Sequence, residues 1–101
     1  MGVPLHAACE RGDTERVRQL LGDGAKIDEK GWRGRTALMY ASRHGYTKVV
    51  QLLLSKDATV GVKDVRGWTA LIQASMKGHT KVVQLLLSKG APVDERRASS
   101  A

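Results

Sequence analysis

The segment KVVQLLLSK at residues 48–56 returns unchanged at residues 81–89. These two copies belong to a longer self-similarity, since 17 of the 23 residues in 36–58 are identical to those in 69–91 without a gap. A weaker third copy lies upstream at the same offset of 33 residues. A fixed period of this length over three copies predicts stacked supersecondary units. The residues of the weaker copy that match the others are Leu5, Ala8, Gly12, Val17, Leu20, Leu21 and Ala25.

Each unit is predicted to hold two short helices followed by a turn-rich arm. In the second unit we expect Thr36 to cap a first helix that runs to about His44, where Gly45 ends it. We expect Thr47 to cap a second helix that carries the leucine run, and an extended arm to follow as far as Trp68. Helices this short are not stable alone in water. Each unit must therefore bury its leucines against the next one, as in a solenoid.

Composition and length limit the protein class. The chain has 101 residues, which predicts one small domain, and 17 Lys and Arg against 10 Asp and Glu give it a net charge of +7. Its apolar runs are too short to cross a membrane, and its first residues lack a secretory signal pattern. Cys9 is the single cysteine, so no internal disulfide can form. We therefore expect an intracellular protein, cytoplasmic or nuclear, without a membrane partner.

Three sequence motifs resemble the ankyrin repeat. They are VPLHAA at residues 3–8, G-x-T-A-L at 34–38 and again at 67–71, and V-V-x-L-L-L-x-x-G-A at 82–91. The resemblance covers residues 3–94 and implies an all-α solenoid of antiparallel helix pairs. It also implies β-hairpin-like arms on one side, a concave surface between the arms and the first helices, and a non-enzymatic role in binding other proteins. The expected repeats are about 3–33, 34–66 and 67–94, within a single domain that ends in a polar tail, 95–101.

Two departures from the family pattern carry structural expectations. Asp57 stands where Gly24 and Gly90 supply a helix-ending glycine. A left-handed backbone is expected there, so we predict a strained or reshaped turn in the second unit. The histidine of the family motif, present as His6, is replaced by Met39 and Ile72, so its usual structural hydrogen bonds should be missing in two units.

The two outer units differ in polarity. Arg16 and Gln19 stand where the other units have valine and leucine, which gives the first unit the polar outer helix expected of an N-terminal cap. The third unit keeps its apolar pattern. Three explanations remain open: a fragment of a longer array, a face covered by a partner or by self-association, and a tolerated exposed edge.

The sequence gives catalysis and metal binding little support. His6 and Cys9 share one helix face, where a thiolate–imidazole pair would be conceivable. However, His6 occupies the structural histidine position of the motif and Cys9 a small packing position. His44 and His79 lie in different units without other ligands at metal spacing, and the glycines of 31–36 lack the strand–helix context of a phosphate loop. We therefore expect no catalytic residue, metal or cofactor.

A candidate partner-binding set combines arm residues with one stripe of the first helices. Trp32 and Trp68 are expected on the arms, and Tyr40 on the exposed stripe. Trp, Tyr and Arg are enriched at binding hot spots, although each Trp could instead pack across neighbouring arms with an arginine stacked on it. The resemblance places these residues on the concave side. The full set is Trp32, Arg33, Arg35, Tyr40, Arg43, His44, Arg66, Trp68, Met76 and Lys77.

Charge distribution indicates the kind of partner. Residues 1–33 are neutral overall, whereas 34–66 carry +4 and 67–101 carry +3. We therefore expect a protein partner with an acidic or mixed acidic–apolar segment. A nucleic-acid-associated module and a fragment or designed array without a specific partner remain alternatives. In the tail, Arg96-Arg97-Ala98-Ser99 resembles a basophilic kinase site, which makes Ser99 a candidate for phosphorylation.

Overall fold

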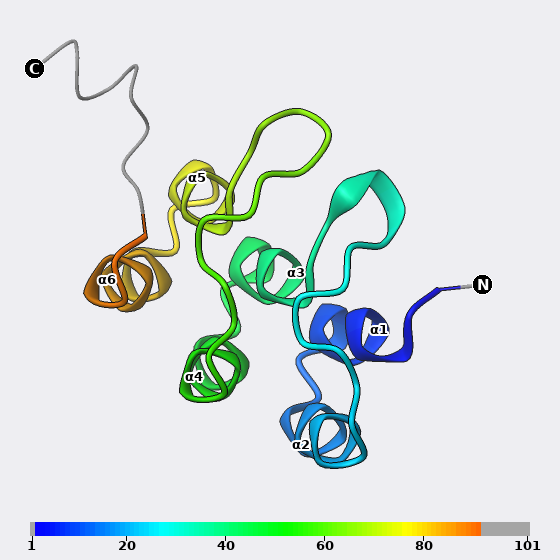
Figure 1. Cartoon of the computed structure of the whole chain (residues 1–101). Helices are drawn as coiled ribbons and strands as arrows, with labels where there is room; N and C mark the ends of the chain where they lie inside the picture. Colours follow the sequence, from blue (N-terminus) through cyan, green and yellow to red (C-terminus); the bar gives the residue numbers. More distant parts are fainter. Residues whose placement is uncertain (1, 92–101) are drawn as a thin grey trace, which may run out of the picture.

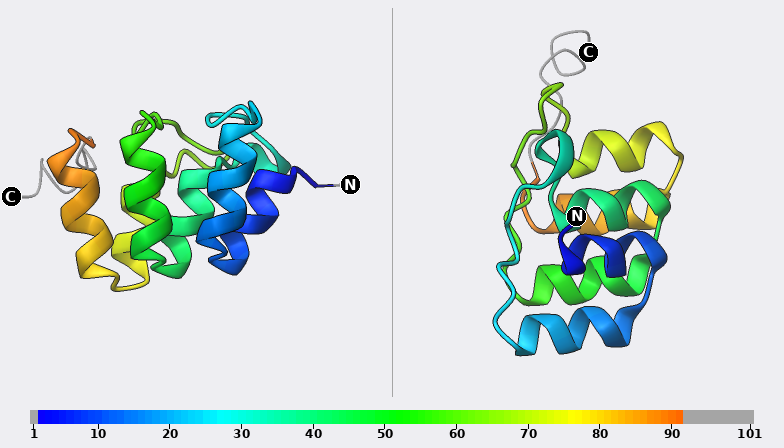
Figure 2. Two further views of the ribbon diagram at one scale, coloured as in Figure 1. Left: turned by 90° about the horizontal axis from the view of Figure 1, so that it is seen from below. Right: turned by 90° about the vertical axis from the view of Figure 1, so that its right-hand side faces the viewer.

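The computed structural model describes residues 2–91, and in these the expected all-α solenoid is confirmed. Three helix pairs stack side by side, with α1, α3 and α5 in one row and α2, α4 and α6 in the other (Figure 1). Both arms lie at the same end of the helices (Figure 2). The helices are α1 Pro4–Arg11, α2 Thr14–Gly22, α3 Ala37–His44, α4 Thr47–Ser55, α5 Ala70–Met76 and α6 Thr80–Ser88, with a 3₁₀ turn η1 at Trp32–Gly34.

The arms are loops whose two sides are joined by a backbone hydrogen bond at the base of each tip. In the first arm the Gly31 N–H donates to the Arg35 carbonyl over 2.8 Å, and in the second the Asp64 N–H donates to the Trp68 carbonyl over 2.9 Å. No strand forms in the residues that the structure describes. The arms therefore keep the hairpin-like course expected of them without building a sheet.

The start and end of the first helices follow from local chemistry. The Thr36 hydroxyl accepts a hydrogen bond from the Met39 N–H at the start of α3, and Gly45, with φ 75°, ends that helix in the left-handed conformation. Both predictions are confirmed. The prediction that Thr47 caps α4 is wrong: Thr47 is the first residue of that helix, and the preceding residue, Tyr46, makes no side-chain cap.

Asp57 adopts the strained turn that the sequence predicts. Its φ is 65°, close to the left-handed values of Gly24, at 96°, and Gly90, at 81°. The Ala58 N–H still donates to the Leu53 carbonyl, as the equivalent residues do in the other two units. The turn is thus preserved rather than reshaped, and an aspartate holds a backbone conformation that favours glycine.

The core lies between successive helix pairs. Although α4 and α6 have the same sequence, TKVVQLLLS, they are buried to different extents. Val50 and Leu54 of α4 are buried, whereas the equivalent Val83 of α6 is half-buried and Leu87 is 46% exposed. Packing against the following helix pair accounts for the difference, because α6 packs against α4. Within α2, Val17 is the one fully buried residue, as expected of a polar outer helix.

The loops between the two helices of each pair approach one another closely at two glycines. A Cβ on Gly12 would lie 3.0 Å from the Tyr46 ring, and a Cβ on Gly45 only 2.5 Å from Nδ1 of His79. The His79 Nε2 also lies at hydrogen-bond distance, 2.9 Å, from the Arg43 carbonyl. Gly45 is therefore required both for its left-handed backbone and for the close approach of the next unit.

Candidate functional site

The tip of the first arm presents an exposed indole with two cations stacked on it. Trp32 is 64% exposed, and the guanidinium carbons of Arg33 and Arg35 lie 4.4 and 5.1 Å from its ring centroid. Guanidinium groups at these distances attract the ring electrostatically. The indole is thereby held in place while most of its surface faces solvent.

The tip of the second arm is built around a buried carboxylate. The Asp64 Oδ1 accepts hydrogen bonds from the backbone N–H groups of Arg66, over 2.8 Å, and Trp68, over 3.0 Å. This arrangement fixes the loop and leaves the Arg66 guanidinium carbon 5.3 Å from the Trp68 ring centroid. Val65, at the same tip, is 72% exposed.

The two arms form one continuous surface. The Val65 N–H donates to the Arg33 carbonyl over 3.0 Å. Farther from the tips, the Asp28 carboxylate accepts hydrogen bonds from the Thr59 N–H and hydroxyl, over 2.9 and 2.6 Å. These contacts fix the arms to each other. We call the combined set the arm-tip surface: Trp32, Arg33, Arg35, Val65, Arg66 and Trp68.

The first arm carries backbone strain at this surface. Arg33 has φ 58°, and it is one of two non-glycine residues with positive φ in the described part of the chain. In the second arm Asp64 braces the turn, but its equivalent in the first arm is Gly31. A Cβ on Gly31 would lie 2.6 Å from the His6 ring, so a side chain is excluded there. Both turns close through the same backbone hydrogen bond, from the Gly34 N–H to the Gly31 carbonyl and from the Gly67 N–H to the Asp64 carbonyl, but in the first arm Arg33 is left-handed.

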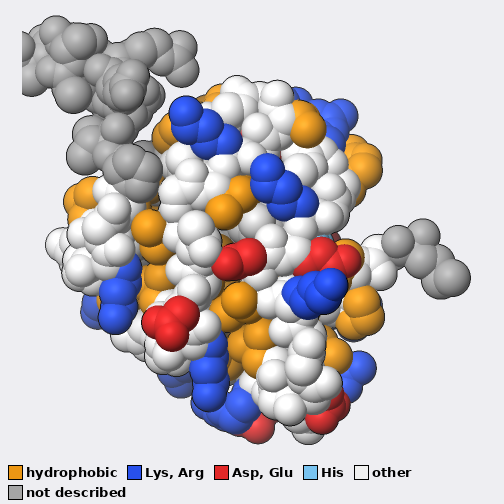
Figure 3. All heavy atoms as spheres, in the orientation of Figure 1, with side chains coloured by type: hydrophobic (Ala, Val, Ile, Leu, Met, Phe, Trp, Pro, Cys, Tyr) orange, Lys and Arg blue, Asp and Glu red, His pale blue; other side chains and the backbone are white. Residues whose placement is uncertain are grey.

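The arm-tip surface is basic and has no internal charge partner. Within residues 2–91 the ion pair that forms joins Arg18 to Glu15 on α2, so none of the arm-tip arginines is paired there. The Nε of Arg35 is buried without a hydrogen-bond partner. Figure 3 shows Lys and Arg side chains together with hydrophobic ones over the arm loops, while the acidic side chains of this face lie nearer its middle and at its lower edge. The surface therefore suits an anionic ligand with apolar groups.

The remaining predicted residues form a separate patch at the ends of the first helices. Arg43 and Met76 occupy the same position in successive units, beside His44 and Lys77. Met76 is exposed, and the His44 ring stacks on the Tyr46 ring with centroids 5.5 Å apart. Residues 37–42 of α3 separate this patch from the arm by about 9 Å of helix. The structure thus does not join the two groups into one compact site.

Tyr40 does not lie on an exposed stripe, contrary to the prediction. It is only 8% exposed, and its ring packs against the His6 ring with centroids 5.3 Å apart. Its equivalent in α5, Gln73, is also buried. This position faces the neighbouring first helix, so a helical wheel drawn for one unit cannot reveal its burial. Val65 is the arm-tip residue that sequence reasoning missed, although its alignment with Trp32 could have indicated it.

His6 and Cys9 have structural environments. The His6 Nε2 is 2.9 Å from the Glu29 carbonyl, and burial lowers the pKa of the imidazole. Burial also raises the pKa of the Cys9 thiol to about 12. The thiol is therefore protonated at neutral pH and lacks the thiolate that nucleophilic chemistry needs.

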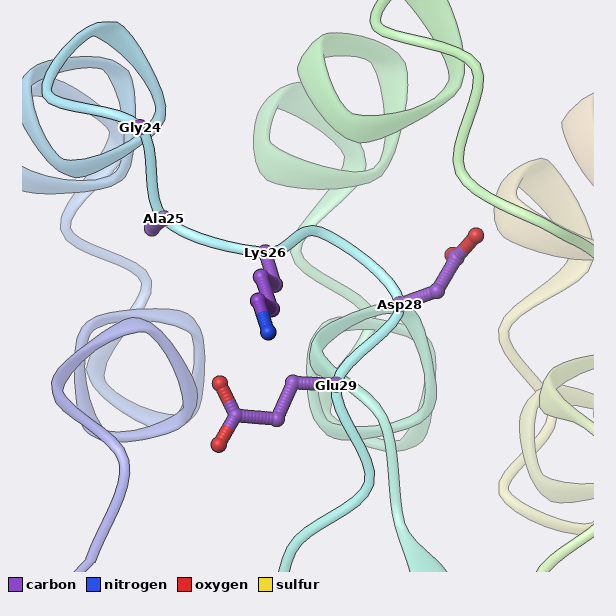
Figure 4. Close-up of a pocket in the computed structure, with 5 residues that line it drawn as sticks. All are labelled: Gly24, Ala25, Lys26, Asp28 and Glu29. Atoms are coloured by element: carbon purple, nitrogen blue, oxygen red, sulfur yellow. The ribbon is translucent and has the colours of Figure 1, made fainter.

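The described residues contain no cluster of side chains suited to binding a metal ion. No group of three His, Cys, Asp or Glu side chains gathers within residues 2–91. A depression of ≈ 620 Å³ is lined by residues 24–26, 28 and 29, where Lys26 and Glu29 turn toward the same space and Asp28 points away (Figure 4). Its mixed charge favours no single class of ligand. No helix in the described part of the chain has the length and apolar character needed to cross a membrane.

Comparison with known proteins identifies the repeat family. The comparison with curated proteins gives no match. A family model of ankyrin repeats, in three copies, matches residues 5–97. Ankyrin repeats generally bind other proteins, and they are generally non-enzymatic binding modules. Because the match covers nearly the whole sequence and the structure is a stack of three helix pairs, this chain belongs to the ankyrin-repeat family.

Proposed function

We propose that the protein is an intracellular, non-enzymatic interaction module whose arm-tip surface binds an acidic or mixed acidic–apolar segment of another protein. The observation that carries this proposal is Trp32, which is 64% exposed and held by two stacked guanidinium groups. An exposed indole of this kind gives a monomeric domain no core stabilisation. It offers a partner a large, rigid contact area.

Three physical features support binding at this surface. Trp and Arg are the side chains most enriched at hot spots. The stacking already restricts the Trp32, Arg33 and Arg35 side chains, so less conformational entropy is lost when a partner binds. The arginines have no ion-pair partner within the described residues, so an incoming carboxylate does not have to displace one.

The patch on the first helices, Arg43, His44, Met76 and Lys77, is proposed as a second contact region for a partner large enough to reach it. Met76 would supply adaptable apolar contact and the basic side chains further attraction. Tyr40 is proposed here only to support α3 through its packing on His6.

Affinity capture from nuclease-treated cell extract, read by mass spectrometry, tests the proposal. The bait would be compared with a Trp32→Ala/Arg66→Ala variant and with a Lys48→Ala control, which removes one exposed charge from α4. Circular dichroism and urea unfolding would first establish that all three fold alike. We expect partners that the control retains and the arm-tip variant loses. Identical capture by all three proteins would refute the arm-tip surface as the binding site.

Nucleic acid is the alternative that the same basic surface must be tested against. Binding of a single-stranded oligonucleotide, lost steeply as salt rises and lost in the arm-tip variant, would favour that alternative. We expect at most weak oligonucleotide binding, because the arginines stacked on Trp32 and Trp68 compete with a base for the ring faces.

Self-association through α6 remains a prediction. The partly exposed Val83 and Leu87 are the residues that could mediate it. Light scattering across concentration tests it, and a monomer at high concentration would contradict it. The candidate phosphorylation site, Ser99, lies outside the described residues.

A further inference from the structure

Two glycines in the stack each contact an aromatic ring of the following unit. A Cβ on Gly12 would lie 3.0 Å from the Tyr46 ring. A Cβ on Gly45 would lie 2.5 Å from Nδ1 of His79. Gly78 occupies the same position in the third unit, but in the described part of the chain no atom lies within 4 Å of a Cβ placed there. The third unit therefore has the glycine of this contact without the ring.

The side chains around Gly78 follow the same pattern. Leu54 of α4 is 5% exposed, whereas the equivalent Leu87 of α6 is 46% exposed. Ser42 of α3 is fully buried, whereas Ser75, at the same position of α5, is exposed. The helices α5 and α6 form the last pair of the stack (Figure 1). Because α4 and α6 have the same sequence, the burial of α4 shows that a further helix pair fits this surface. We call this surface the end face: Ser75, Gly78, Val83 and Leu87.

A hydrogen-bond acceptor and nearby charges specify the partner further. The His79 Nε2 lies 2.9 Å from the Arg43 carbonyl, and the Met76 carbonyl occupies the equivalent position beside the end face. A ring that carries an N–H group can donate to this carbonyl. The exposed side chains of Lys81 and Lys89 form no ion pair within residues 2–91. Acidic side chains at the edge of a partner would therefore meet opposite charge.

A second copy of the chain does not supply the complementary residues. In its first unit Asp13 stands where the other units have the ring, and Arg16 stands where Val49 and Val82 are buried. Head-to-tail stacking of two copies would thus bury an arginine in place of a valine. Two copies joined through their end faces would bring the same lysines together, because a two-fold contact uses the same patch on both copies. Residues 92–101 contain no aromatic side chain and cannot supply the ring either.

We propose that the end face binds a helix pair of another protein, in which a histidine ring is followed by two aliphatic side chains spaced as Val82 and Leu86 are after His79. The ring would lie against Gly78 and donate its N–H to the Met76 carbonyl, while the aliphatic side chains cover the end face. This interaction goes beyond the function proposed above, because it uses α5 and α6 rather than the arm tips.

A probe with these features can be made from the chain itself. In the probe, Asp13→His and Arg16→Val give the first unit the ring and the valine of the third unit, and Leu20 already supplies the leucine. Leu87→Glu blocks the end face of the probe, and a control probe carries Leu87→Glu alone. Sedimentation equilibrium of each probe with the unchanged chain measures binding, once circular dichroism and urea unfolding have shown that all the proteins fold. Asp13→Tyr, which reproduces the ring of the second unit, replaces Asp13→His if that probe does not fold.

We expect the probe to bind the unchanged chain at least about tenfold more tightly than the control probe does, because the control probe must bury an arginine. Leu87→Glu in the receiving chain should remove this difference. Gly78→Ala in the receiving chain should weaken binding, because its Cβ would take the place of the ring. Gly24→Ala strains a similarly left-handed backbone in the first unit and should leave binding unchanged.

Three results would overturn the proposal. Equal binding of the two probes would show that the ring and the valine are not recognised. A preference for the probe that survives both Leu87→Glu and Gly78→Ala would show that the probe binds elsewhere. Self-association of the unchanged chain that Leu87→Glu abolishes would assign the end face to a second copy instead of another protein. All of these proteins keep Trp32 and Arg66, so none of the three results bears on the arm-tip surface.

Discussion

Asp57→Gly should stabilise the protein. Asp57 is the C-terminal residue of the turn that follows α4, and its φ of 65° is a conformation that costs a non-glycine residue about 1–2 kcal/mol, with aspartate at the lower end. Its exposed carboxylate also lies near the negative end of the helix dipole, which costs about 0.5 kcal/mol. Glycine removes both penalties but adds about 0.5–1 kcal/mol of unfolded-chain entropy. The expected net gain is about 0.5–1 kcal/mol.

Urea unfolding followed by circular dichroism measures this gain. The transition midpoint should rise at an unchanged slope, and the melting temperature should rise by about 2–8 °C for a domain of this size. The hydrogen bond from the Ala58 N–H to the Leu53 carbonyl is present already, so the substitution changes strain and charge without adding a contact.

The reciprocal substitution is the control. Gly24 occupies the same position in the first unit with φ 96°, and a Cβ there would meet no atom within 4 Å. Gly24→Asp should therefore destabilise by about 1 kcal/mol or more through strain alone. If Asp57→Gly left the midpoint unchanged or lowered it, an interaction of the Asp57 side chain would have to offset the strain, and the reasoning from the left-handed backbone would fail.

Three further outcomes follow from the packing. Leu54→Ala should lower the free energy of unfolding, measured in urea, by about 2–5 kcal/mol. Leu87→Ala should lower it by less than about half as much, because Leu87 lies in a helix of identical sequence but its side chain is 46% exposed. Equal losses would contradict the described burial of α4 and α6. Gly45→Ala should lower the free energy of unfolding clearly more than Gly24→Ala does. Both substitutions strain the backbone, but only Gly45→Ala places a Cβ 2.5 Å from the His79 ring. Similar losses of stability would show that His79 moves aside freely. Cys9 should resist thiol reagents at pH 8 until urea unfolds the chain, since burial raises its pKa from 9.0 to about 12. The same shift should make stability fall as pH rises from about 9 towards 12, where the unfolded thiol ionises first, and Cys9→Ala should flatten this fall; rapid native-state labelling would refute the burial.

Local chemistry allowed much of the fold to be predicted from sequence. The repeat period predicted the stacking of units, and Thr36 and Gly45 mark the ends of α3 because a hydroxyl cap and a left-handed glycine act within one turn. Asp57 was identified as strained for the same reason. The capping role expected of Thr47 was wrong because the chain between α3 and α4 turns one residue earlier, at Tyr46.

The candidate site was less predictable because it depends on contacts between units. Tyr40 has the pattern of an exposed residue within its own unit, but it is buried where α1 and α3 meet and packs on His6. Sequence alignment placed both tryptophans on arms without showing that their tips touch. That contact runs through the Val65 backbone, which no side-chain pattern encodes.

The first arm packs on His6 of the first helix pair. His6 fills the space beneath this arm and binds the Glu29 carbonyl, which leaves room only for glycine at position 31. The first arm consequently lacks the carboxylate with which Asp64 braces the second. In this arm Arg33 is left-handed, and its guanidinium lies over the exposed Trp32 ring. A single histidine thus links the core of the first unit to the arm whose tip is proposed to bind a partner.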